Sequence, residues 1–137
     1  DHKGGLLFLT ARSVNTKRFE IPEGVDKPVY LLYYVLQNKI TNVAVVESQI
    51  DALYLWSLGI PAIALFGTGS STQYELLKKC GVRVFNVMFD GDEGGVKGAA
   101  RFRRNMPSHI LVNTFVLPDG KDINDLSEEE IRALHCY

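Results

Sequence analysis

The feature that most constrains the fold of this sequence is a regular alternation, beyond residue 41, of short apolar runs with segments of helical periodicity. The short runs are continuously apolar, which is typical of strands buried on both faces of a parallel sheet. The segments between them carry apolar residues at helical spacing, and two of them end close to a glycine, as helices commonly do. Strands that alternate with helices in this way indicate an α/β fold in which right-handed crossovers connect parallel strands.

The predicted elements follow one another as this fold requires, with strands at Val43–Val46, Ala62–Phe66, Val82–Phe89 and Ile110–Leu117 and helices at Ile50–Leu58, Thr72–Lys79, Gly94–Asn105 and Glu128–Leu134. They predict a parallel sheet of about four strands flanked by helices. The chain before residue 41 is less regular. It contains a predicted short strand at Leu6–Ala11 and an apolar, helix-like run at Val29–Leu36, and we interpret it as a small N-terminal appendage.

Composition limits what kind of protein this is. With 137 residues and 46% hydrophobic content, the chain is long enough for one domain with a substantial core. Its net charge of −1 means that any contact with nucleic acid has to come from a local basic patch. The two cysteines, Cys80 and Cys136, lie far apart, so we expect no zinc site and a reducing, cytoplasmic environment. No apolar run reaches the roughly 18 residues of a membrane span, so we expect no membrane contact.

Acidic residues fall at the ends of the predicted strands. Glu47 follows the first strand, Asp90 and Asp92 follow the third, and Asp119, Asp122 and Asp125 follow the fourth. Ligands of open α/β sheets bind beyond the carboxyl ends of the strands, where these side chains would meet. Carboxylates brought together repel one another unless a cation neutralises them, and oxygen ligands suit Mg²⁺ or Mn²⁺ rather than zinc. The pattern therefore predicts a metal site that handles phosphates.

Each acid also has a simpler explanation when it is considered alone. Asp-Gly-Asp is common in turns. Glu47 could be an acid that stabilises a helix start through the helix dipole, and Asp122 and Asp125 could lie in a solvated loop. The coincidence of all of them at strand ends favours the metal site.

The residues around these acids resemble motifs of a known family. Val45–Leu53 resembles the first motif of the Toprim domain of DnaG-type DNA primases, and Phe89–Gly95 with Ala99-Ala100 resembles the second. Gly59–Thr68 is similar to the connecting strand and loop, and Leu117–Leu126 to the third acidic stretch. The resemblance implies a Toprim fold.

The resemblance extends into the first part of the chain. Asp1–Arg12 resembles the end of the N-terminal subdomain of the primase core, and Lys27–Leu31 resembles the lysine-bearing segment that leads into the Toprim fold. It implies a division into residues 1–40, the end of that subdomain, and residues 41–137, the Toprim domain.

The chain also departs from the family pattern. Ser48 stands where the family usually has glycine, and Gly95 lies one position past the usual glycine. Asn124 occupies a position that is often aspartate in bacterial replicative primases, and this form is similar to phage or mobile-element relatives.

The resemblance implies a DNA primase fragment, which synthesises RNA primers on single-stranded DNA by metal-dependent nucleotidyl transfer. It implies one or two Mg²⁺ or Mn²⁺ ions. Glu47, Asp90 and Asp92 would be catalytic and would hold the metal together with Asp122. Glu47 could instead act as a general base. Further ligands, or residues that support the ligands, would be Asp51, one helical turn past Glu47, and Asp125.

Basic residues complete the implied site. The resemblance implies nucleotide or DNA contacts by Arg12, Lys17, Lys27 and Lys97. The expected partners are a single-stranded DNA template, ribonucleoside triphosphates and a replicative helicase, the last bound through regions outside this chain. We expect the fragment alone to be weakly active or inactive.

Two other functions remain compatible with the residues. A Toprim nuclease would use the same acids for hydrolysis. A primase-like module of a mobile element would bind DNA or a helicase without catalysis, and the departures at Ser48 and Asn124 support that alternative. Template-directed incorporation of ribonucleotides would distinguish the primase from both.

Overall fold

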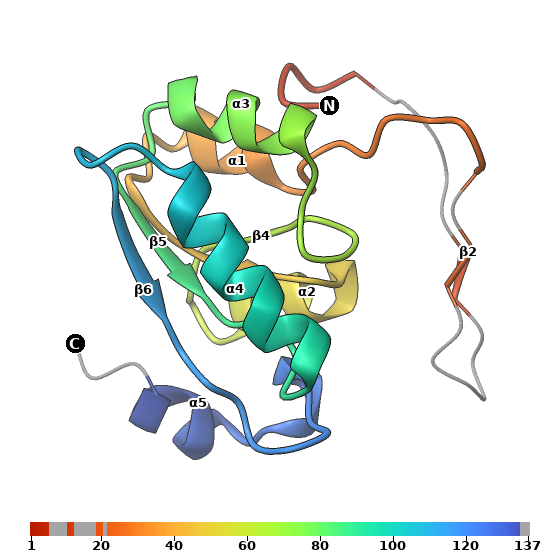
Figure 1. The fold of residues 1–137 in the computed structure, drawn as a ribbon, viewed down its shortest axis with the longest axis vertical. Coiled ribbons are helices and arrows are strands. Elements are labelled where there is room, and N and C mark those ends of the chain that lie inside the picture. Colours follow the sequence, from red (N-terminus) through yellow and green to blue (C-terminus); the bar gives the residue numbers. More distant parts are fainter. Residues whose placement is uncertain (6–10, 13–18, 21, 135–137) are drawn as a thin grey trace.

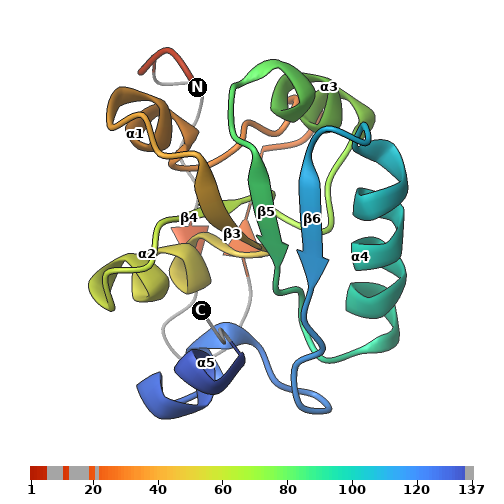
Figure 2. The same cartoon turned by 90° about the vertical axis from the view of Figure 1, so that its left-hand side faces the viewer.

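The structure is a computed structural model, which describes residues 1–5, 11–12, 19–20 and 22–134. Its centre is a parallel sheet with the strand order β4-β3-β5-β6 (Figures 1 and 2). The strands are β3 (Asn42–Val46), β4 (Ala62–Ala64), β5 (Val84–Val87) and β6 (Leu111–Thr114). The prediction of an α/β fold with about four parallel strands is confirmed.

The remaining elements are helices and one small strand pair. The helices are α1 (Leu32–Gln37), α2 (Gln49–Ser57), α3 (Ser71–Lys79), α4 (Glu93–Asn105), the 3-10 turn η1 (Ile123–Asp125) and α5 (Glu128–Leu134). The antiparallel pair β1 (Ala11–Arg12) and β2 (Phe19–Glu20) lies apart from the sheet in Figure 1. Most of the strand predicted at Leu6–Ala11 falls outside the described residues. None of the helices in the described segments has the length and hydrophobicity to cross a bilayer.

Helices cover both faces of the sheet, and each face has its own core. Residues from α1, α3 and α4 form one core with the strand side chains Val45 and Phe85, both fully buried. Residues from α2, η1 and α5 form the other core, together with Val46 and Met88. Figure 2 shows α4 on one side of the strands and α2 and α5 on the other. Burial on both faces explains why the strands are continuously apolar.

The start of α1 differs from the prediction of a helix over Val29–Leu36. Tyr30 instead forms an antiparallel bridge with Ala64, with N–H to O=C distances of 2.9 and 3.2 Å. Leu31 then adopts a left-handed conformation with φ of 65°, and the helix begins only at Leu32. The chain therefore adds to the edge of the sheet beside β4 before it turns into α1.

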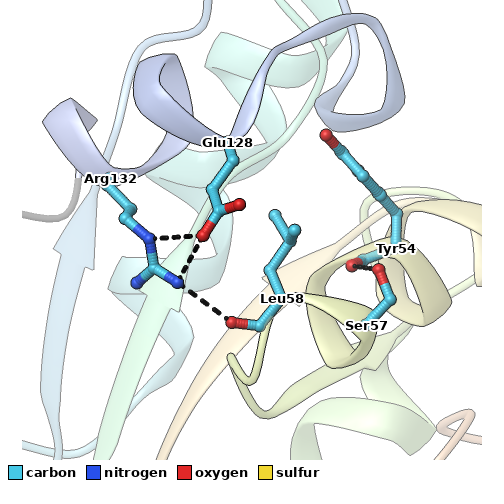
Figure 3. Close-up of polar contacts among 5 residues, drawn as sticks. All are labelled: Tyr54, Ser57, Leu58, Glu128 and Arg132. Carbon is cyan, nitrogen blue, oxygen red and sulfur yellow. Dashed lines mark hydrogen bonds and ion pairs between the residues drawn. The ribbon is translucent and has the colours of Figure 1, made fainter.

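Polar contacts hold α5 against the end of α2, as Figure 3 shows. Arg132 pairs with Glu128 at 2.7 Å and donates a hydrogen bond to the carbonyl oxygen of Leu58 at 3.2 Å. The hydroxyl of Tyr54, on α2, donates to the carbonyl of Leu126 at 3.0 Å. These bonds hold the segment that carries the third acidic stretch against α2.

A row of asparagine side chains crosses the sheet. The Asn86 amide donates to Oδ1 of Asn42 at 2.6 Å, and the Asn113 amide donates to Oδ1 of Asn86 at 2.9 Å. Asn86 is 1% exposed, so its polar atoms depend on these partners. The row links β3, β5 and β6, and it fixes their register because a shift of one residue would leave the amide of Asn86 in an apolar core.

We therefore expect Asn86→Ala to lower the free energy of unfolding by about 2–3 kcal/mol, because it removes the side-chain hydrogen bonds of Asn86 and leaves the Asn42 and Asn113 side chains without this partner. Asn113→Ala, at a partly exposed position, should cost about 1 kcal/mol. Urea denaturation of the two variants measures the difference, and equal losses would contradict a central role for Asn86.

Candidate metal centre

The ends of β3 and β5 bring the first two acids together. Glu47 follows β3 directly and is half-buried, and its Oε1 accepts a hydrogen bond from the backbone N–H of Asp90 at 3.1 Å. Asp90 follows β5 after two further buried residues, Met88 and Phe89. The carbonyl of Glu47 accepts from the N–H of Gly67, at 3.1 Å, so the loop after β4 lies at the same edge of the sheet.

Asp92 begins α4. Its Oδ1 accepts a hydrogen bond from the N–H of Gly95 at 2.7 Å, which makes it the N-cap of that helix. The turn is tight, because a Cβ atom on Gly95 would lie 2.0 Å from the carbonyl oxygen of Asp90. Gly95, which departs from the family spacing, is thus required by the backbone of this chain.

Backbone hydrogen bonds hold the third acidic stretch, residues 117–126, against the Asp-Gly-Asp loop, residues 90–92. The N–H of Gly91 donates to the carbonyl of Lys121 at 2.8 Å, and the N–H of Gly120 donates to the carbonyl of Gly91 at 2.7 Å. These bonds bring Asp122 to the edge of the sheet where Asp90 lies. Asp122 is the N-cap of η1, and Asp122 and Asp125 each accept a hydrogen bond from the backbone N–H of the other, at 3.0 and 3.1 Å.

Asp51 connects the segment around Glu47 with the third acidic stretch, residues 117–126. It is 2% exposed, and its Oδ2 accepts from the Ser48 hydroxyl at 2.7 Å. Its Oδ1 accepts from the backbone N–H of Asn124 at 3.0 Å. Ser48 is also the N-cap of α2 and accepts from the N–H of Asp51 at 3.2 Å. Sequence reasoning missed this capping role, because it treated Ser48 only as a departure from glycine; a serine three residues before an acid at a helix start is the signal that could have found it.

The carboxylates perturb one another. Burial first, and then the charges of Glu47, Asp51, Asp122 and Asp92, raise the pKa of Asp90 to about 7. Burial likewise raises the pKa of Glu47, against the hydrogen bond from Asp90, and the charges of Asp92, Asp51 and Asp122 add to the rise. We call these five residues the acidic rim. Within it, every negative charge makes the next one less favourable.

The chemistry of the acidic rim fits a hard divalent cation, since its donors are carboxylate oxygens that repel one another. In the described residues, however, no three Asp, Glu, His or Cys side chains form a group that could hold a metal ion. Glu47, Asp92 and Asp122 each accept a backbone hydrogen bond instead.

The basic residues predicted to bind nucleotide or DNA have different surroundings. Lys27 is exposed and donates to the carbonyl of Phe66 at 2.9 Å, beside a cleft of about 530 Å³ that includes Thr68 and the start of α3. Lys97, on α4, pairs with Glu93 of the same helix. Arg12 belongs to β1 by its backbone, and Lys17 lies outside the described residues.

The fold and the acidic rim define a domain of the Toprim class, and comparison with known proteins agrees. Residues 44–127 match the family described as Toprim-like, and the chain belongs to that family. The Gene 57 protein of Mycobacterium phage D29 is 28% identical over 101 residues, which are 74% of this chain and 64% of the phage protein.

Solved primase structures share the fold over 98% of this chain. A DNA primase domain from Pseudomonas aeruginosa is 25% identical with a TM-score of 0.76, and the chain spans 47% of it. The DnaG catalytic core is 22% identical with a TM-score of 0.75, and the chain spans 49% of it. The zinc-binding and RNA polymerase domains of the Aquifex aeolicus primase are 24% identical with a TM-score of 0.72, and the chain spans 37% of them. The resemblance to the Toprim domain of DnaG-type primases is confirmed.

The two adjacent glycines of α4 give a direct test of the tight turn. Gly95→Ala should lower the free energy of unfolding by about 3 kcal/mol or more, since the new Cβ cannot fit beside the Asp90 carbonyl. Gly94→Ala is the matched control, because its Cβ would meet only the Asp92 side chain at 3.3 Å, and the change should stabilise α4 by up to about 1 kcal/mol. Thermal unfolding of both variants measures this, and a harmless Gly95→Ala would contradict the close approach.

The raised pKa of Asp90 predicts how the metal-free protein responds to pH. The folded state holds its proton more tightly than the unfolded state, so the stability that this group contributes is fully present below pH 3.8 and is lost as the pH rises through about 7. At pH 8 with a chelator, Asp90→Asn should be more stable than the wild type by about 1–2 kcal/mol, a value reduced from the full shift because solvent screens this partly exposed group.

The same comparison at pH 4 should show almost no difference. Glu129→Gln, which removes an exposed carboxylate outside the acidic rim, should leave the pH dependence of unfolding unchanged. Parallel pH profiles for the wild type and Asp90→Asn in chemical denaturation would show that repulsion at the acidic rim is negligible.

Proposed function

We propose that this chain is part of the catalytic portion of a DNA primase, which synthesises RNA primers on a single-stranded DNA template. The observation that carries the proposal is the acidic rim, where burial, and then the charges of carboxylates from three separate chain segments, raise the pKa values of Asp90 and Glu47. A fold shared with primase catalytic cores over 98% of the chain supports it. Clustered, perturbed carboxylates at the end of a sheet are typical of phosphate chemistry that depends on a cation.

The residues that would hold one or two Mg²⁺ or Mn²⁺ ions are Glu47, Asp90, Asp92 and Asp122. A bound ion supplies positive charge for the phosphates of a nucleotide and for the attacking oxygen. Asp51 would act indirectly, a role supported by the hydrogen bonds that its two oxygens accept from Ser48 and from the backbone of Asn124. Asp125 would act in the same way through its bonds with Asp122.

Glu47 has a second role open to it. Burial and the neighbouring charges raise its pKa, which is the direction that lets a carboxylate take up a proton near neutral pH. It could therefore receive the proton of the attacking hydroxyl. The catalytic group would then consist of Glu47, Asp90 and Asp92.

Basic residues would bind the phosphates of the nucleotide and the template. Lys27 lies beside the loop at Gly67, whose N–H bonds to the carbonyl of Glu47, so a phosphate near Lys27 would also be close to the acidic rim. Arg12, Lys17 and Lys97 would extend these contacts to DNA. The division of the chain at residues 1–40 and 41–137 follows the same proposal, with the first part carrying template contacts.

The wider setting follows from the same proposal. A replicative helicase would bind through regions outside this chain, and the protein would act in the cytoplasm, where Cys80 stays reduced. The chain spans 64% of the phage relative and less than half of each primase chain named above. Primer synthesis is therefore proposed for the whole protein.

The first test is Mn²⁺ binding by calorimetry, with wild type and with Asp90→Asn plus Asp92→Asn. Asparagine still caps α4 in place of Asp92, so folding should be preserved while the ion affinity falls at least tenfold. The control is Glu23→Gln plus Glu129→Gln, which removes the same charge from exposed positions outside the acidic rim. Equal affinity in both double variants would contradict the metal site.

The second test is template-directed incorporation of ribonucleotides by the full-length protein. We expect incorporation with Mn²⁺ or Mg²⁺ and its loss in the Asp90→Asn plus Asp92→Asn variant. Cleavage of nucleic acid without incorporation would favour a Toprim nuclease, and metal binding without either reaction would favour a non-catalytic binding module.

A further inference from the structure

A groove begins at the acidic rim and follows α4 away from it. It lies between α4 and the segment that continues β6, residues 114–119, and has a volume of about 650 Å³. Asp90, Asp92 and Asp119 line one end, and Arg103 and Arg104 line the other. We call it the α4 groove. Its two ends therefore have opposite charge.

The walls of the α4 groove are apolar although they face solvent. Val96 on α4 is 53% exposed and Val116 on the facing segment is 75% exposed. Phe115 and Ala100 line the groove beside them. Exposed apolar side chains that gather on the two sides of one groove mark a binding surface more often than single exposed valines do. Such walls suit apolar contact with the faces of bases and the carbon atoms of sugars.

The arginines at the far end differ from the other basic residues of α4. Lys97 pairs with Glu93, and Arg101 donates to Thr68 at 2.6 Å and to the Tyr74 hydroxyl at 3.2 Å. Arg103 and Arg104 form no side-chain hydrogen bond or ion pair within the part of the chain that the structure describes. Two cations without an internal partner are therefore available to an anion in the groove.

The length of the groove suits a polymer of a few units. The 13 residues of α4 extend over about 20 Å at roughly 1.5 Å per residue. A stacked nucleic-acid strand advances about 3.4 Å per nucleotide, so up to about five nucleotides would separate a phosphate at the acidic rim from one at the arginines.

We propose that the α4 groove binds a short single strand of nucleic acid, one end of which lies at the acidic rim. The inference rests on the proposed function, since the phosphate at the rim needs a cation there. Arg103 and Arg104 bind phosphates further along the strand, and Val96 and Val116 contact its bases or sugars. A nucleic-acid strand fits better than a protein segment, because it carries an anion in every unit and so meets both the cation-dependent end and the arginine end.

The test is fluorescence anisotropy of labelled DNA and RNA octamers of the same sequence, measured with the full chain in Mg²⁺. Arg103→Gln plus Arg104→Gln should weaken binding about tenfold or more and reduce the salt dependence by about one to two released ions. The control is Lys78→Gln plus Lys79→Gln, a basic pair in the last turn of α3. It removes the same charge from an equivalent helix end outside the groove, so it should change affinity much less. Equal losses in the two double variants would overturn the proposal.

A second pair of variants tests the apolar wall. Val116→Asp puts a negative charge inside the groove and should weaken binding several-fold. Leu111→Asp is its control, because Leu111 is 56% exposed and does not line the groove. Both positions are exposed, so both variants should fold, which thermal unfolding checks. Unchanged binding by Val116→Asp would also overturn the proposal.

Comparing the labelled RNA with the labelled DNA shows which nucleic-acid strand the α4 groove binds. Tighter binding of RNA would assign the groove to the primer, and tighter binding of DNA would assign it to the template. Groove-dependent binding by a protein that makes no primer would contradict the proposed function alone. A protein that makes primers, but binds oligonucleotides equally well in all variants, would contradict the groove alone.

Discussion

The acidic rim depends on a close approach of two backbone segments at Gly91. A Cβ atom at this position would lie 2.0 Å from the carbonyl oxygen of Pro118, so only glycine fits. Hydrogen bonds to Lys121 and from Gly120, at 2.8 and 2.7 Å, hold the segments together. This contact brings the third acidic stretch near Asp90, although no carboxylate takes part in it. The position of the acids is thus set by the backbone, and their mutual repulsion has to be tolerated.

Hydrogen-bond donors offset that repulsion, as a bound cation would. Glu47 and Asp92 each accept a hydrogen bond from a backbone N–H, and Asp51 accepts from both a hydroxyl and a backbone N–H. Bonds of this kind favour the charged form of a carboxylate. Burial and the neighbouring charges nevertheless raise the pKa of Asp90 to about 7. A cation bound beside Asp90 would favour its charged form and so would replace a proton there.

The sequence predicted the parts of this arrangement that depend on local pattern. Buried parallel strands are continuously apolar, so the order of residues along the chain is enough to locate the strands and the acids that follow them. It does not locate the start of α1, which depends on a bridge between Tyr30 and Ala64 and on the left-handed conformation of Leu31. The burial of Asp51 depends on Asn124, 73 residues away, which no local pattern reports. Long-range backbone contacts of this kind decide how the acids are held once the fold has brought them together.

The same contacts change the meaning of the two departures from the family pattern. Asn124 bonds to Asp51 through its backbone N–H, so that bond does not depend on the Asn124 side chain. Ser48 has an ordinary extended conformation, with φ of −111°, and therefore does not need to be glycine. Its hydroxyl gives Asp51 a donor at 2.7 Å that glycine would lack, which stabilises a carboxylate that is 2% exposed. Neither departure removes a bond from the acidic rim, and Ser48 adds one. The choice between a primase and a non-catalytic module therefore rests on metal binding and primer synthesis.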